Sequence, residues 1–245
     1  MLELKNLVWT LPGGEEIIKG ITMHAAPGKL TVVTGPNGGG KTSIAKLTAG
    51  LYAPTSGSIL LDGNDITGLD MTERAKLGIA YAFQMPVHFK GLTVRDLLEI
   101  SAEDKLDEGR LCGLLGKVGL CAHDYIDRPV DASLSGGEIK RIEIATVLAR
   151  KNARLLVFDE PEAGIDLWSF TSLIEVFRAL REERDRAMLV ISHQERILDI
   201  ADEIVVIANG KVRVAGPREA VLPTLLAEEK QASCPIRTQT AAVSC

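Results

Sequence analysis

A glycine-rich segment at residues 35–42, GPNGGGKT, has the residue types and spacing of a phosphate-binding loop. It matches the pattern G-x-x-x-x-G-K-[ST] and lies between a predicted strand and a predicted helix, the context that this pattern requires. Glycines let successive backbone N–H groups turn toward phosphate oxygens at the positive end of a helix dipole. We expect Lys41 to reach the β- and γ-phosphates of a nucleotide and the Thr42 hydroxyl to ligate magnesium. A glycine-rich turn without a ligand is the structural alternative, and the flanking elements argue against it.

Two carboxylates follow the apolar strand LLVF at residues 155–158, where the chain continues as Asp159-Glu160-Pro161. Open α/β sheets bind ligands at the carboxyl ends of their parallel strands, which is where these side chains are placed. Asp159 suits Mg²⁺, which prefers hard oxygen donors, and Glu160 suits a base that orients an attacking water. A polar start to a loop is the alternative, because Pro161 must end the strand in either case.

Three further polar positions stand where strands end or helices begin. Gln84 follows the predicted strand IAYAF at 79–83, and His193 follows AMLVI at 187–191. Residues 134–138, LSGGE, place Ser135 three residues before Glu138, which is typical of a capping box that opens a helix. For His193 the structural alternative is a hydrogen-bonded residue beside a Ser192–Glu195 capping box.

These groups require a scaffold of alternating strands and helices. The patterns predict strands at 2–11, 15–24, 30–33, 58–61, 79–83, 155–158 and 187–191, and helices at 41–49, from 70, from 135 to about 150, at 167–183 and from 192. This alternation predicts a parallel, doubly wound sheet. Residues 93–126 carry longer helical patterns, which predict a mostly helical insertion, and Asn209-Gly210 between two apolar runs predicts a hairpin at 203–216.

Composition excludes several classes of protein. The 245 residues include 28 basic and 33 acidic side chains, so the net charge of −5 provides no global positive field for nucleic acid or an anionic membrane. No apolar run approaches the roughly 18 residues of a spanning helix, and no signal-peptide pattern is visible. We therefore expect a cytoplasmic protein that does not insert into the membrane or bind nucleic acid, with four reduced cysteines. The polar segment 226–245 is expected to be disordered.

Taken together, GPNGGGKT, Gln84, LSGGE, LLVFDE and His193 occur in the order of an ATP-binding cassette, and the chain resembles the ABC-type ATPases over about residues 1–225. The resemblance implies an α/β P-loop NTPase fold, with a RecA-like mixed sheet, an antiparallel β subdomain and a helical subdomain at about residues 93–150. It also implies ATP and Mg²⁺ as cofactors and ATP hydrolysis as the activity. The implied assembly is a head-to-tail homodimer, in which each ATP lies between the phosphate loop of one subunit and the LSGGE segment of the other.

Residue roles in this family carry over to the positions that match its motifs. The residues implied to bind ATP within the subunit are Gly35, Pro36, Asn37, Gly38, Gly39, Gly40, Lys41, Thr42 and Ser43. The implied catalytic residues are Glu160, His193 and Gln84, and the implied Mg²⁺ ligands are Thr42, Gln84 and Asp159. Across the dimer interface the implied residues are Ser135, Gly136 and Gly137, with Ser135 and Gly137 at the γ-phosphate of the partner's ATP, and Asp166 in the AGID segment.

Two positions depart from the family pattern. Leu11 stands where many cassettes stack adenine on an aromatic residue, and Trp9 lies two residues earlier on the same strand face. Base stacking and nucleotide selectivity are therefore expected to be weaker. Gly39 replaces a common serine of the phosphate loop, which leaves Lys41 and Thr42 intact.

A second level of resemblance concerns the partner. Glu138 stands where transporter cassettes commonly have glutamine, and the run IKRIEI at 139–144 is similar to the ATPase of the SUF iron-sulfur cluster assembly machinery, as is AFQMPVHFKGLTV at 82–94. This resemblance implies a SUF-type scaffold protein as partner. The alternative is the nucleotide-binding subunit of a membrane transporter, which would act with a permease and lie peripheral to the membrane. A nucleotide-gated switch without turnover is disfavoured, because Glu160 retains the base.

The segment MPVHFKG at 85–91 has no helical period. Phe89 is therefore predicted to be an exposed aromatic anchor for the partner, and a core position is the alternative.

Overall fold

The computed structural model of the chain describes residues 1–85 and 89–232. Its centre is a six-stranded sheet with the order β10-β9-β3-β8-β7-β6. The strands are β3 (Leu30–Thr34), β6 (Ile79–Ala82), β7 (Leu155–Asp159), β8 (Ala187–Ile191), β9 (Glu203–Ala208) and β10 (Lys211–Pro217). Five of them are parallel and β10 is antiparallel, paired to β9 through the predicted Asn209-Gly210 hairpin.

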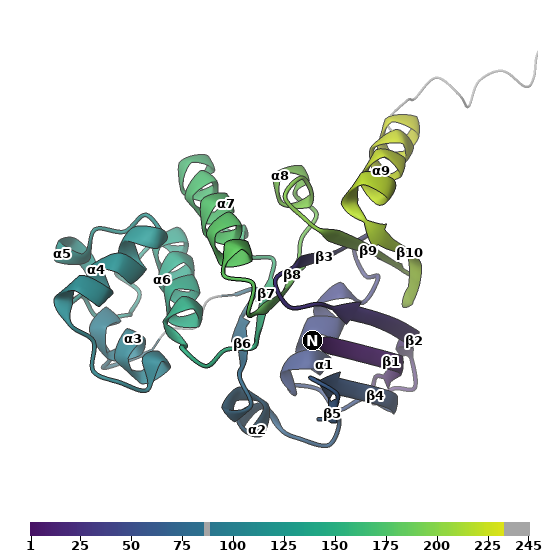
Figure 1. Ribbon diagram of the computed structural model, residues 1–245, viewed down its shortest axis with the longest axis horizontal. Helices are drawn as coiled ribbons and strands as arrows, with labels where there is room; N and C mark the ends of the chain where they lie inside the picture. The colour runs from purple at the N-terminus through teal and green to yellow at the C-terminus, as the bar shows by residue number, and fades with distance from the viewer. Residues whose placement is uncertain (86–88, 233–245) are drawn as a thin grey trace, which may run out of the picture.

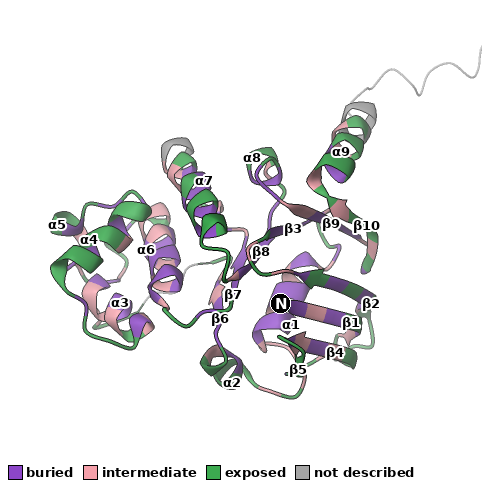
Figure 2. Cartoon of the chain, viewed as in Figure 1, coloured by how far each residue is buried: buried purple, intermediate pink, exposed green. Residues whose placement is uncertain are grey.

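A second, four-stranded antiparallel sheet with the order β2-β1-β4-β5 stands beside helix α1 (Figure 1). Its strands are β1 (Leu2–Thr10), β2 (Glu16–Ala25), β4 (Ser56–Leu61) and β5 (Asn64–Asp65). Buried residues recur at every second position in residues 2–4 of β1, 21–25 of β2 and 59–61 of β4, as expected of a sheet with one face against the core (Figure 2).

The helices are α1 (Lys41–Ala49), α2 (Met71–Lys76), α3 (Val94–Ala102), α4 (Glu108–Lys117), α5 (Ala122–Tyr125), α6 (Gly136–Ala149), α7 (Leu167–Glu182), α8 (Glu195–Leu198) and α9 (Arg218–Ala232). Helices α3 to α6 gather on one side of the mixed sheet, away from the antiparallel sheet (Figure 1). A Thr93–Asp96 capping box begins α3, and a Ser135–Glu138 capping box begins α6. The predicted α/β architecture, with a mixed sheet, an antiparallel sheet and a helical part, is confirmed.

The buried strands β3, β7 and β8 separate two hydrophobic clusters. Leu156 and Phe158 of β7 face the cluster that contains α6 and α7, whereas Leu155 and Val157 face the cluster with α1 and the antiparallel sheet. Because these strands are parallel, their carboxyl ends meet at one edge, and Asp159 pairs with Ile191 there. The sheet thus brings the segments that follow β3, β6, β7 and β8 together.

The expectation of a disordered segment from residue 226 is wrong for its first part, because α9 continues to Ala232. Leu225 and Leu226 pack on the larger hydrophobic cluster, and this contact offsets the cost of ordering the helix. Residues 233–245, with Cys234 and Cys245, lie outside the described residues. Within residues 1–85 and 89–232, no helix has the length and apolar character needed to cross a membrane.

Candidate nucleotide-binding site

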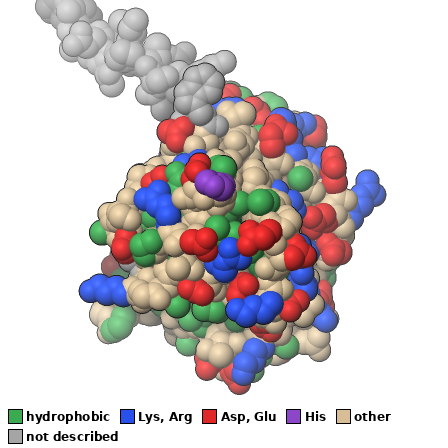
Figure 3. Space-filling model, turned by 90° about the vertical axis from the view of Figure 1, so that its left-hand side faces the viewer, with side chains coloured by type: hydrophobic (Ala, Val, Ile, Leu, Met, Phe, Trp, Pro, Cys, Tyr) green, Lys and Arg blue, Asp and Glu red, His purple; other side chains and the backbone are tan. Residues whose placement is uncertain are grey.

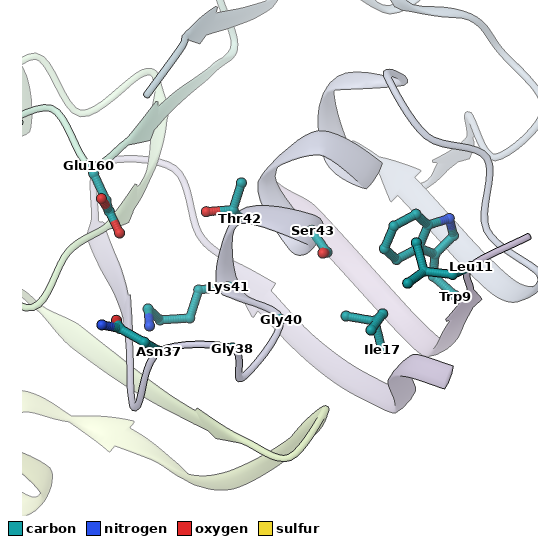
Figure 4. Close-up of a pocket in the computed structure, with 10 residues that line it drawn as sticks. All are labelled: Trp9, Leu11, Ile17, Asn37, Gly38, Gly40, Lys41, Thr42, Ser43 and Glu160. Carbon is teal, nitrogen blue, oxygen red and sulfur yellow. The ribbon is translucent and has the colours of Figure 1, made fainter. Parts of the chain in front are cut away.

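The phosphate loop connects β3 to α1 and closes around the Lys41 ammonium. Lys41 is 6% exposed, and its Nζ donates to the backbone carbonyls of Gly35 at 2.7 Å and Pro36 at 2.9 Å. Burial lowers the pKa of Lys41, while the nearby charges of Glu160 and Asp159 oppose that effect. Two of the three ammonium donors are thus bound to backbone carbonyls. Figure 4 shows the Lys41 side chain lying beside the loop.

Two glycines of the loop lie close to the backbone of β9, and at Gly35 a side chain has no room. A Cβ at Gly35, whose φ is +132°, would lie 2.0 Å from the carbonyl oxygen of Ile207. A Cβ at Gly39 would lie 3.0 Å from the same oxygen and 3.0 Å from that of Pro36. The N-cap of α1 is Gly40, so the first N–H groups of the helix, which have no intrahelical partner, face the loop without a capping side chain.

Asp159 is fully buried at the end of β7, and each of its carboxylate oxygens accepts a hydrogen bond from a hydroxyl group. The Thr42 hydroxyl donates to Oδ1 at 3.1 Å, and the Tyr81 hydroxyl of β6 donates to Oδ2 at 3.0 Å. Burial raises the pKa of Asp159, which these two hydrogen bonds oppose. Thr42 and Asp159 present adjacent hard oxygen atoms, the donor type that Mg²⁺ prefers, so the residues present fit this ion.

Glu160 follows Asp159 in the sequence, and its side chain contacts that of Gln84. The Gln84 amide Nε2 donates to Glu160 Oε2 at 2.7 Å, so the segments after β6 and β7 meet. Glu160 has a φ of 45°, a left-handed conformation that side chains seldom adopt, and its N–H donates to the Ile191 carbonyl at 3.0 Å. Backbone strain of this kind, held by neighbouring structure, is concentrated at functional sites.

These groups border a cavity of about 360 Å³. It is lined by Trp9, Leu11, Ile17, Asn37, Gly38, Gly40, Lys41, Thr42, Ser43 and Glu160. Figure 4 shows Glu160 and Lys41 toward one end and the apolar side chains of the antiparallel sheet toward the other. Trp9 stacks on Tyr52 with ring centroids 4.5 Å apart and an interplanar angle of 7°. The cavity therefore joins a charged end to an apolar end.

His193 and Asp166 lie on the segments that follow β8 and β7. His193 is exposed, and the Ser192–Glu195 capping box that belonged to the alternative for His193 does not form, because α8 begins after Gln194. The Ser192 hydroxyl instead donates to Glu162 at 2.6 Å and accepts from the N–H of Gln194. Asp166 accepts from the N–H and hydroxyl of Ser169 in the first turn of α7.

The LSGGE segment begins α6. The predicted capping box is confirmed, since Ser135 Oγ accepts from the Glu138 N–H and Glu138 Oε2 accepts from the Ser135 N–H. Ser135 and Gly136 are exposed, and the described residues that line the cavity include none from this segment. Within one chain, the structure therefore does not bring Ser135, Gly136 and Gly137 to the phosphate loop.

Sequence reasoning missed two side chains that hold this site. Tyr81 contacts Asp159, and its pKa is raised by burial and by the charge of Asp159. Burial raises the pKa of Glu162, whose Oε1 accepts from Ser192. A tyrosine in an otherwise aliphatic strand and an acidic residue directly after Pro161 were the available indications.

Comparison with known proteins agrees with this geometry. The model of the family described as ABC transporter matches residues 18–163. The chain is 36% identical over 216 residues to the uncharacterized ABC transporter ATP-binding protein MJ0035 of Methanocaldococcus jannaschii, covering 84% of this chain and 86% of that protein. It is 32% identical over 235 residues to the probable ATP-dependent transporter ycf16 of Cyanophora paradoxa, covering 89% of each.

A solved structure shares the fold. The dimeric, post-hydrolysis structure of the ATP-binding cassette MJ0796 with ADP and Pi is 23% identical, with a TM-score of 0.80 over 89% of this chain and 99% of that chain. The phosphate loop, the buried Asp159 and the matched family model together lead to one assignment. The chain belongs to the ABC transporter family and is a P-loop ATPase of the ATP-binding cassette type.

Proposed function

We propose that the chain is a cassette subunit that dimerises head to tail around two MgATP molecules and uses their hydrolysis to change the conformation of a partner protein. The observation that carries this proposal is that the candidate ATP-binding residues lie in two separate places on one chain. The cavity contains Lys41, Thr42 and Glu160, whereas Ser135 is exposed at the start of α6 outside it. A second copy supplying its α6 N-terminus would complete the phosphate site with a further set of N–H groups.

The charged end of the cavity is suited to binding the phosphates of a nucleotide and holding them in position. Lys41 exchanges the carbonyls of Gly35 and Pro36 for phosphate oxygens, and the N-terminus of α1 adds backbone donors. Thr42 and Asp159 would hold Mg²⁺, which neutralises charge on the phosphate oxygens when bound.

Hydrolysis is assigned to Glu160 acting with Gln84 and His193. The Glu160 carboxylate accepts a proton from the attacking water, and the Gln84 amide, 2.7 Å from Oε2, orients that carboxylate. His193 on the neighbouring segment is assigned to the γ-phosphate. Asp166 is assigned to the subunit interface in addition to its contacts with Ser169.

The apolar end of the cavity is assigned to the nucleotide base. Trp9, Leu11 and Ile17 line this end, and Leu11 is 36% exposed. An aliphatic side chain packs on a base without the stacking energy of an aromatic ring. We therefore expect the base to be bound more weakly than an aromatic residue at position 11 would bind it.

Mixing two defective chains tests the shared site. Ser135→Arg places a bulky cation at the α6 N-terminus and leaves its own phosphate loop intact, whereas Lys41→Ala removes the phosphate contact and leaves α6 intact. In a mixed pair, one composite site carries both defects and the other carries neither. We expect the mixture to hydrolyse ATP when neither chain does so alone, and inactivity at every ratio would count against the arrangement.

For the partner, we propose a SUF-type scaffold protein. The supporting residues are Glu138, which accepts from the Tyr125 hydroxyl, and the LSGGEIKRIEI run around it. Phe89 is 42% exposed and Met85 is 80% exposed, so both are available to a partner. The face over the helical part mixes acidic, basic and hydrophobic side chains (Figure 3).

A transporter permease is the second candidate, because the relatives at 36% and 32% identity are described as transporter proteins. Purification of the chain from native cells with its bound partner, followed by mass spectrometry, separates the two candidates. A soluble scaffold is the expected result, and a transmembrane permease would overturn the scaffold assignment.

A further inference from the structure

The backbone of Phe83, directly after β6, is held by two side chains of α6. Lys140 Nζ donates to the Phe83 carbonyl, and Glu143 Oε1 accepts from the Phe83 N–H at 2.6 Å. Lys140 and Glu143 also pair with each other, with 3.1 Å between Nζ and Oε2. Both backbone polar groups of one residue are thus bound by a single ion pair, which we call the Phe83 clamp.

The clamp lies in an environment that is costly for charge. The Lys140 side chain is fully buried, and burial raises the pKa of Glu143 against the influence of Lys140. Replacing a buried ion pair by apolar residues of similar size is often neutral or stabilising, so stability alone does not account for this pair. What it adds is a directional hold on Phe83, which directly follows β6, the last strand of the sheet in the described part of the chain.

Phe83 connects α6 to the reacting groups. The next residue is Gln84, whose Nε2 donates to Glu160 Oε2 at 2.7 Å. Helix α6 itself begins directly after Ser135. Because a helix rises about 1.5 Å per residue, Lys140 lies roughly 7 to 8 Å along the axis from Ser135. One rigid helix therefore carries both the exposed Ser135 end and the hold on the segment that reaches Glu160.

We propose that Lys140 and Glu143 are positioning residues that fix Gln84, and through it Glu160, relative to α6, so that docking of the Ser135 end against a partner subunit's nucleotide sets the geometry for hydrolysis. The inference rests on the function proposed above for Gln84 and for the dimer. Its physical basis is that a misplacement of about 1 Å at a reacting group can cost about 10²-fold in rate.

The test compares variants of the clamp with variants of a matched ion pair. Lys140→Met removes the donor to Phe83 with little change in volume. The double variant Lys140→Met/Glu143→Gln also removes the charge that would be left unpaired, and it keeps an amide oxygen for the Phe83 N–H. The control is Arg178→Met/Glu175→Gln on α7, because that pair has the same i,i+3 spacing and a 2.8 Å contact but is exposed.

We expect the clamp variants to lower kcat for ATP hydrolysis by about 10- to 100-fold, with the KM for ATP unchanged, while the control retains its kcat. If Lys140→Met does not fold, the double variant carries the test, with thermal unfolding as the check. Unchanged kcat in a folded double variant would overturn the proposal.

A double-mutant cycle with Gln84→Ala distinguishes positioning from a structural role. If the clamp acts through Gln84, the Lys140→Met/Glu143→Gln change has no further effect on kcat in the Gln84→Ala background. If the effects of the two changes on the activation free energy are fully additive, the proposal is overturned. If Gln84→Ala alone leaves kcat unchanged, the role proposed for Gln84 fails and the clamp fails with it, which is a different result from additivity.

Discussion

Replacing Lys41 by methionine is the most quantitative test of the phosphate loop. The stem of Lys41 is buried and methionine fills a similar volume, so the change removes the ammonium and little else. The carbonyls of Gly35 and Pro36 lose their donor, but Pro36 is exposed and Gly35 half-buried, so water can replace it. Removing a buried charge also relieves a desolvation cost. We therefore expect the free energy of unfolding to change by less than about 1 kcal/mol.

The loss appears in nucleotide binding. In the free protein the Lys41 ammonium bonds to neutral carbonyls, and in the complex it bonds to charged phosphate oxygens. A hydrogen bond to a charged group contributes about 1.5 to 3 kcal/mol, which corresponds to a Kd for ATP that is weaker by about 12- to 150-fold.

Isothermal titration with ATP measures this effect directly. Lys151→Met is the control, because Lys151 pairs with Asp104 at 2.8 Å and neither residue is among those that line the cavity. The control is expected to bind ATP as the unaltered chain does. Near-normal affinity in Lys41→Met, with the protein folded, would refute the assignment of this loop to phosphate.

Three further predictions concern other parts of the molecule. The pKa of Glu138 is lowered to about 2, and the hydrogen bond from the Tyr125 hydroxyl is the largest of several causes. This bond therefore stabilises the fold above the ordinary glutamate pKa, and its contribution is lost as pH falls toward 2. Tyr125→Phe should lower the urea midpoint at pH 7 and leave it unchanged below pH 2. Leu11→Tyr should supply a ring for the base and tighten ATP binding by at least about fivefold in titrations, since stacking contributes about 1 to 3 kcal/mol per base; unchanged affinity would place the base elsewhere. Phe89→Ala should cost more than about 2 kcal/mol of affinity for the co-purified partner while ATP binding is retained, whereas lower thermal stability without the partner would show Phe89 to be a core residue.

Local patterns predicted the parts of the structure that depend on local chemistry. The GPNGGGKT loop, the Asp159-Glu160 strand end, the Ser135–Glu138 capping box and the Asn209-Gly210 hairpin lie where the sequence places them. Each depends on residues a few positions apart, whose backbone preferences and hydrogen bonds do not require knowledge of the rest of the chain.

Contacts between distant segments were not predictable from those patterns. The hydrogen bond from Tyr81 to Asp159 joins β6 to the end of β7, and the one from Ser192 to Glu162 joins the segments after β8 and β7. Only the order of the strands in the sheet brings these residues together. The same holds for Lys140 and Glu143, which read as ordinary polar positions on a helix but bond to the backbone of Phe83. The end of α9 was misjudged for a related reason, because its packing on the core is tertiary.

The sedimentation of Glu160→Gln tests the central claim, a dimer that closes around MgATP, most directly. This change removes the base but keeps a side chain of the same shape beside Gln84, so ATP should bind without being hydrolysed and the closed dimer should accumulate. We predict a dimer in analytical ultracentrifugation with MgATP, a monomer without nucleotide, and a monomer with MgATP when Ser135→Arg is added. A Glu160→Gln chain that binds ATP yet remains monomeric at high protein concentration would contradict the shared site.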